Sequence, residues 1–254
     1  MKLRVLGCSG GIGGNLRTTS FLLDRDVLID AGTGVSELSL SELTAIDHVF
    51  VTHSHLDHIA CIPFMLDSVG LMRDNPLTVY AIEETLDILK QHVFNWKIWP
   101  DFSEIPSAEH PYLRYQPVEL GKAIVLNGRN ITPIPANHVV PAVGYQLDSG
   151  GASLVFSGDT TTCDALWEAV NKIKNLRYLI IETAFSNSEK DLAVISKHLC
   201  PSMLADELVK FKLDAEIFIT HLKPGELELT MQEIEDCVHG RSPRMLLNNQ
   251  EFEF

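Results

Sequence analysis

The sequence predicts a layered fold of the α/β or α+β class, in which two β-sheets are flanked by helices. Many short apolar segments are rich in β-branched residues and bounded by Gly, Asp or Asn, as strands are. Segments with apolar residues at helical spacing lie between them. Steps from strand to strand and from strand to helix both occur, which favours two sheets over one doubly wound sheet.

In chain order, the expected strands are Lys2–Leu6, Ser20–Leu23, Val27–Asp30, Val49–His53, Thr78–Ala81, Ile131–Pro135, Gly144–Leu147, Ser153–Ser157, Leu179–Glu182 and Ile217–His221. The expected helices are His58–Met72, Glu83–Val93, Cys163–Lys172, Pro201–Lys212 and Met231–His239. The chain shows no internal repeat, low-complexity stretch or linker. We therefore expect one domain spanning residues 1–254.

The composition excludes several classes of protein. No apolar run reaches the roughly 18 residues of a membrane span, and Arg4 interrupts the short apolar stretch before Cys8, so we expect a soluble, cytoplasmic protein without membrane partners. Five scattered cysteines without a CxxC argue against a disulfide framework or a thiolate zinc knuckle. The formal net charge of −14 argues against long nucleic acids, whose binding relies on clustered Lys and Arg. A small anionic substrate remains compatible, because a metal site can reverse the local charge.

The strongest motif is the segment Thr52-His53-Ser54-His55-Leu56-Asp57-His58, which follows an apolar run. Side chains alternate along an extended segment, so His53 and His55 project to the same side. After a turn, Asp57 and His58 can face a second point nearby. Three imidazoles and one carboxylate are costly to bury without a partner, and they are ligand types that zinc, iron and manganese accept. The motif therefore predicts a metal site.

Three further candidate ligands follow apolar strands elsewhere in the chain. His138 follows the strand that ends at Pro135, Asp159 follows the strand that ends at Ser157, and His221 ends the last strand. Each residue alone has an ordinary explanation as a loop or turn residue. Their shared position at the carboxyl ends of strands indicates one site.

Together, the HxHxDH motif, a later His, a Gly-Asp and a final His resemble the ligand set of the metallo-β-lactamase superfamily. The resemblance implies an α+β fold, the four-layer αββα sandwich of two mixed sheets flanked by helices, with the site at the edge between the sheets. It implies two divalent metal ions, with zinc expected and manganese or iron as alternatives. One ion would be held by His53, His55 and His138, the other by Asp57, His58 and His221, and Asp159 would bridge them.

The second half is similar to the cyclic-nucleotide phosphodiesterase and tRNA 3′-processing endonuclease branches. It contains Ser157-Gly158-Asp159-Thr160, then Glu182-Thr183-Ala184-Phe185, then His198-Leu199-Cys200-Pro201. Other segments look like the bacterial class II-like 3′,5′-cyclic-nucleotide phosphodiesterases, among them Gly7–Gly13 and Asn95–Phe102. The resemblance implies His198 as the proton donor to the leaving group and Glu182 as its orienting partner. Asp57 would belong to the catalytic centre as well as to the ligand set.

The leading functional hypothesis is hydrolysis of 3′,5′-cyclic nucleotides, or of a related small phosphodiester, through a metal-bridging hydroxide. The alternatives are a metallohydrolase of a thioester, lactone or lactam, an RNA-processing nuclease, and a non-enzymatic metal-binding or redox protein. No basic arm of the kind that grips tRNA is present. The aromatic segment Phe94–Phe102 could stack a purine, cover the core, or form a homodimer contact.

Overall fold

The computed structural model describes residues 1–254 and contains two seven-stranded mixed sheets. The first sheet has the order β14 (Glu251–Glu253), β1 (Lys2–Gly7), β2 (Ser20–Leu23), β3 (Val27–Ile29), β4 (His48–Phe50), β5 (Leu77–Ala81) and β6 (Leu113–Pro117). Strands β3 to β6 are parallel to one another, whereas β14, β1, β2 and β3 pair antiparallel.

The second sheet repeats this mixture of parallel and antiparallel pairs. Its order is β13 (Arg244–Met245), β12 (Glu216–Thr220), β11 (Leu176–Glu182), β10 (Ser153–Phe156), β9 (Val143–Asp148), β8 (Arg129–Pro135) and β7 (Ile124–Leu126). Strands β10 to β13 are parallel, and β7 to β10 pair antiparallel. Because β8 and β10 both pair antiparallel with β9, β8 runs in the same direction as β10, β11 and β12.

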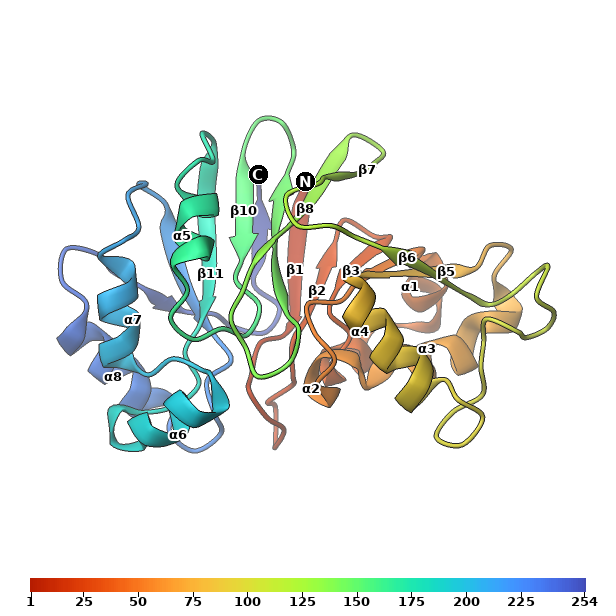
Figure 1. Ribbon diagram of the computed structural model, residues 1–254, viewed down its shortest axis with the longest axis horizontal. Helices are drawn as coiled ribbons and strands as arrows, with labels where there is room; N and C mark the ends of the chain where they lie inside the picture. Colours follow the sequence, from red (N-terminus) through yellow and green to blue (C-terminus); the bar gives the residue numbers. More distant parts are fainter.

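Helices cover the outer face of each sheet (Figure 1). Those beside the first sheet are α1 (Leu40–Ala45), α2 (Leu56–Ile59), α3 (Cys61–Val69) and α4 (Glu83–Ile88), which continues as a short π-helix over Leu89–Val93. Those beside the second sheet are α5 (Asp164–Val170), α6 (Lys190–Ser196), α7 (Pro201–Leu208) and α8 (Leu227–Cys237). Short 3₁₀ turns lie at Thr33–Glu37, Gly70–Met72 and Asn187–Glu189. None of the helices has the length and apolar character that crossing a bilayer requires.

Three hydrophobic layers separate these four layers of secondary structure. One core, rich in aromatic rings, lies between the sheets and includes Phe50 and Phe156. The other two cores lie between a sheet and its helices. Alternation along each strand sends side chains to different layers, so Val49 joins an outer core while Phe50 faces the other sheet. The predicted α+β sandwich of two mixed sheets flanked by helices is therefore confirmed.

The single helix predicted over His58–Met72 is wrong, because the chain breaks it at Ala60. Ala31, two residues after the end of strand β3, bonds to the chain on both sides of the break. The N–H of Cys61 donates to the carbonyl of Ala31, and the N–H of Ala31 donates to the carbonyl of His58. These contacts replace the regular helical hydrogen bonds with bonds to residues about thirty positions away in sequence, which local periodicity cannot reveal.

The aromatic segment Phe94–Phe102 mostly covers the hydrophobic core, which was one of the three roles considered for it. Phe94 and Phe102 are buried in the outer core of the first sheet. The Trp99 ring packs edge-on against Phe64 with 5.3 Å between ring centroids. Trp96 is different, because 60% of its surface is exposed. Of these four aromatic residues, only Trp96 is therefore exposed.

Candidate metal centre

The predicted ligands come together at one edge of the sandwich because they follow the carboxyl ends of strands. His138, Asp159 and His221 follow β8, β10 and β12, which run in the same direction in the second sheet. The HxHxDH motif begins shortly after β4 of the first sheet. The two sheets therefore face each other across the site, and each sheet contributes side chains to it.

The first group contains His53, His55, His138 and Asp159, whose ligand atoms all lie within 4.8 Å of one another. Nδ1 of His55 lies 3.2 Å from Nε2 of His138. Nε2 of His53 lies 3.6 Å from Oδ2 of Asp159. This donor set of three imidazoles and one carboxylate suits a divalent transition metal.

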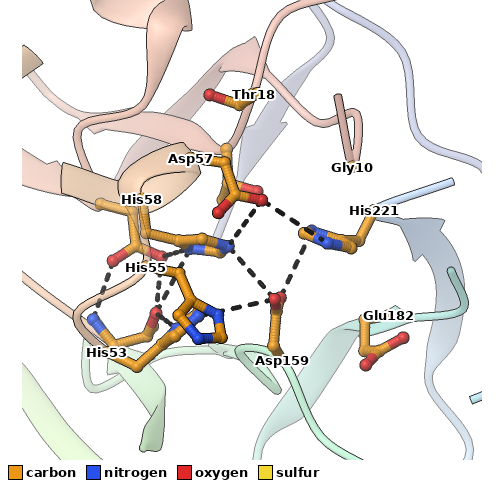
Figure 2. A network of polar contacts seen from close by, with 12 residues as sticks. Gly10, Thr18, His53, His55, Asp57, His58, Asp159, Glu182 and His221 are labelled. Carbon is orange, nitrogen blue, oxygen red and sulfur yellow. Dashed lines mark hydrogen bonds and ion pairs between the residues drawn. The ribbon is translucent and has the colours of Figure 1, made fainter. Parts of the chain in front are cut away.

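The second group contains Asp57, His58, His221 and again Asp159. Figure 2 shows Asp159 between His58 and His221, with its oxygens 3.4 Å from Nε2 of His58 and 3.3 Å from Nδ1 of His221. The Asp57 carboxylate lies on the other side of both rings, at 3.9 and 3.8 Å. These groups contain the same residues as the two predicted sets, and Asp159 is the member they share.

Unpartnered nitrogen atoms test whether these residues fit a metal. Nε2 of His53, Nε2 of His58 and Nδ1 of His221 are buried and have no hydrogen-bond partner. Such atoms cost free energy unless something binds them. Burial lowers the pKa of His138 to about 4 and that of His221 to about 3, so both rings are neutral at pH 7, as metal ligands must be. The side chains therefore fit divalent ions.

The pKa of His58 shifts in the opposite direction from those of His138 and His221. Burial opposes its charged form, but the carboxylates of Asp159 and Asp30 raise the pKa of His58 well above its usual value. The two carboxylates therefore favour a positive charge at this point, which a divalent cation held by His58 would supply in place of the proton.

Hydrogen bonds on the far side of the rings set their orientation. Nδ1 of His58 donates to Oδ2 of buried Asp30 at 2.7 Å. The Thr52 hydroxyl donates to the same carboxylate at 2.8 Å, so its oxygen is free to accept from Nδ1 of His53 at 3.1 Å. Each bond leaves the opposite nitrogen, Nε2, turned toward the ligand group. Thr52 lies directly before the HxHxDH motif, yet sequence reasoning missed its role.

The glycine-rich segment Gly7–Gly13 approaches the site closely. A Cβ atom at Gly10 would lie 2.4 Å from the carbonyl oxygen of His221, so no larger residue fits there. Lys223, which sequence reasoning missed, donates from Nζ to the carbonyl of Gly10 at 2.8 Å. Figure 2 shows Gly10 beside His221.

His198 and Glu182 lie next to the ligand groups and contact each other. Nδ1 of His198 donates to Oε1 of Glu182 at 2.7 Å. The Glu182 carboxylate also accepts from the N–H of Thr160 at 3.0 Å, which fixes its position. Burial lowers the pKa of His198, but the charge and hydrogen bond of Glu182 outweigh burial and raise it. The His198 ring stacks on His221 and lies edge-on to His138, with centroid distances of 5.1 and 4.9 Å.

A comparison with known families identifies the class of protein. Residues 25–234 match the family described as "Beta-lactamase superfamily domain". The chain therefore belongs to the metallo-β-lactamase superfamily and is a metal-dependent hydrolase that binds divalent metal.

Individual proteins are similar to this chain at low sequence identity. A probable 3′,5′-cyclic-nucleotide phosphodiesterase from Yersinia pestis is 26% identical over 273 residues, covering 87% of this chain and 77% of its own length. A ribonuclease Z from Synechococcus sp. is 25% identical over 286 residues, covering 88% of each protein. The crystal structure of unliganded yeast PDE1 matches 100% of this chain and 99% of its own with a TM-score of 0.82 at 17% identity, which shows a shared fold.

Proposed function

We propose that this protein is a dinuclear metal-dependent phosphodiesterase that hydrolyses 3′,5′-cyclic nucleotides or a related small phosphodiester. The observation that carries the proposal is the hydrogen-bonded pair of His198 and Glu182 beside two adjoining ligand groups. Relatives named cyclic-nucleotide phosphodiesterase and ribonuclease Z support this class of reaction, since both names denote cleavage of phosphodiester bonds.

In this proposal each ligand group holds one divalent ion, expected to be zinc, and Asp159 lies between the ions. When bound, two such ions lower the pKa of a water between them and offset negative charge on the phosphoryl oxygens. With neutral imidazoles, the carboxylates of Asp57 and Asp159 leave the occupied site at a charge of about +2. That charge attracts a phosphodiester monoanion despite the net charge of −14 on the chain.

His198 delivers the proton that the leaving alkoxide needs. Nδ1 of its ring is engaged with Glu182, so Nε2 is the nitrogen available to a substrate. Glu182 is fully buried and favours the protonated ring. A carboxylate-oriented imidazole of this kind contributes roughly 10²–10⁴-fold to a hydrolysis whose leaving group is a poor one.

Two features of the site favour a small substrate over RNA. The amines of Lys197 and Lys223, which lie beside the site, already donate to backbone carbonyls of the chain itself. The side chains of Leu56 and Val139, next to the ligands His55 and His138 in sequence, are exposed and apolar. A long polyanion gains little from such surroundings, since its binding depends on free cationic groups.

The test is a comparison of kcat/KM values for zinc- and manganese-loaded protein. The substrates are cAMP, cGMP, bis(p-nitrophenyl) phosphate, a precursor tRNA, a thioester and a β-lactam. We expect a cyclic nucleotide to exceed the tRNA, the thioester and the lactam. If the tRNA or the thioester exceeds every cyclic nucleotide by about tenfold, a difference of about 1.4 kcal/mol in transition-state stabilisation, the phosphodiesterase proposal fails.

A further inference from the structure

Lys197 ends helix α6 in a conformation that its residue type disfavours. Its φ and ψ of 54° and 50° lie in the left-handed region, where glycine or asparagine usually ends a helix. For other residue types this conformation is disfavoured, because Cβ comes too close to the following carbonyl oxygen. Lysine at this position therefore needs compensation from contacts that glycine cannot make.

Lys197 contacts the loop that contains His138 through its backbone carbonyl, as any residue could, and through its side-chain amine, as glycine could not. The backbone carbonyl of Lys197 accepts a hydrogen bond from Nδ1 of His138 at 3.0 Å. Its Nζ returns to the same loop and donates to the carbonyl of His138 at 3.1 Å and to Oδ1 of Asn137 at 3.2 Å. One residue thus holds the ring, the backbone and the neighbouring side chain of this loop.

The carbonyl contact determines the state of the His138 ring. A carbonyl oxygen only accepts, so Nδ1 of His138 must carry the proton, and Nε2 presents its lone pair. Nε2 is the atom that faces His55 in the first ligand group. The residue after Lys197 is His198, whose ring lies beside that of His138. The same turn therefore sets both the ligand and the proposed proton donor.

We propose that Lys197 is a positioning residue that holds His138 in the orientation and tautomer required for metal binding, with its ammonium group fixing the loop from the far side. The inference rests on the proposed ligand role of His138. It concerns metal affinity in the first group, and it would hold for any substrate of the site.

Three substitutions at this position separate the ammonium group from the backbone conformation. Lys197→Gly removes the ammonium group but suits the left-handed turn, Lys197→Met keeps the aliphatic chain without the charge, and Lys197→Arg keeps a cationic donor. Lys190→Met is the matched control, because Lys190 begins the same helix and its Nζ reaches only Ser202, at 3.4 Å.

The measurement is zinc affinity, by competition with a fluorescent chelator, together with the melting temperature of the metal-free protein. Both Lys197→Gly and Lys197→Met keep the backbone carbonyl that accepts from Nδ1 of His138 and lose only the ammonium contacts. We therefore expect them to weaken one of two zinc-binding steps by about 10-fold, the lower end of the range for lost outer-shell contacts. Lys197→Arg should recover much of the loss, and Lys190→Met should match the wild type. Metal-free Lys197→Gly should melt no lower than the wild type, which separates lost metal affinity from lost folding.

Wild-type zinc affinity in both Lys197→Gly and Lys197→Met would overturn the inference, as would an equal loss in Lys190→Met. Because the chelator assay uses no substrate, its result is independent of the substrate panel. A protein that hydrolyses no phosphodiester could still show the Lys197 effect, and an active phosphodiesterase could lack it.

Discussion

Replacing Asp30 by Asn tests how the second ligand group is supported. Asp30 is fully buried, and its carboxylate accepts hydrogen bonds from Nδ1 of His58 at 2.7 Å and from both the N–H and the hydroxyl of Thr52 at 2.8 Å. Its φ of 57° lies in the left-handed region, which Asn tolerates as well as Asp does. The substitution therefore preserves shape and backbone and changes only the hydrogen-bonding groups.

The expected magnitude follows from those three bonds. If the Asn oxygen keeps the bond to the Thr52 N–H, its amide group replaces Oδ2 and faces the N–H of His58 with another donor. Relief requires His58 to move its proton to Nε2, where the proton blocks the lone pair meant for a metal. Loss of such an outer-shell partner typically weakens metal binding by about 10- to 100-fold, or about 1.4–2.7 kcal/mol.

Zinc titration against a competing chelator measures the effect. The Thr52 hydroxyl, which supports His53 of the first group, also donates to Oδ2 of Asp30. We therefore expect both binding steps to weaken, and the step that involves His58 to weaken more. Asp67→Asn, at an exposed position of helix α3, is the control for the loss of one negative charge. Two zinc-binding steps with wild-type affinity in Asp30→Asn would show that the Asp30 contact does not support the metal.

Three other outcomes follow from the site and the fold. Asp159→Ala should release at least one ion and abolish turnover while far-ultraviolet circular dichroism stays native, since the ions would face each other uncompensated; normal turnover with both ions would place the bridge elsewhere. His198→Ala should retain metal and lower kcat/KM on cAMP by roughly 10²–10⁴-fold, yet affect p-nitrophenyl esters far less; equal losses would indicate a structural role. Arg129→Met should lower the free energy of unfolding by about 1–3 kcal/mol, because half-buried Asp26 loses the two hydrogen bonds of 2.6 and 2.7 Å that it accepts from Arg129. The hydrogen bond from Arg129 lowers the pKa of Asp26 in the folded protein. The stabilisation is therefore complete above the unfolded pKa of about 3.9 and is lost as the pH falls through the lower folded pKa. If urea unfolding shows the same loss of stability in Arg129→Met at pH 3 as at pH 7, the ion pair is not its cause.

The sequence predicted at which edge of the sheets the candidate ligands gather, because short segments of sequence mark the strand ends that place them. Apolar strands end shortly before His138, Asp159 and His221, and parallel strands bring their carboxyl ends to a common edge. The HxHxDH spacing supplies the remaining side chains. These features depend on residues that are neighbours in sequence.

Helix α1 and strand β6, which have few or no buried residues, were not predicted from the sequence. Helix α1 has no buried residue and so lacks an apolar stripe, although Ser39 and Glu42 form a capping box that marks its start. Strand β6 lies at the edge of its sheet, is largely exposed and ends at Pro117. Its composition therefore resembles that of a loop.

Contacts between residues that are far apart in the chain could not be predicted from the sequence either. The bond between Lys197 and His138 joins residues 59 positions apart. The bond between His58 and Asp30 spans 28 positions. Such contacts depend on how the two sheets pack, which a single sequence leaves open.

The division of each ligand group between the two sheets ties the stability of the protein to the free concentration of its ion. Unfolding separates His138 and His221 from the HxHxDH segment, so the folded state binds the ion far more tightly than the unfolded chain does. By mass action, an ion at about 100 times its Kd adds about 2.7 kcal/mol to the free energy of unfolding per site. A melting temperature measured for this protein therefore depends on the activity of its divalent ion in the buffer, and traces of chelator will lower that melting temperature.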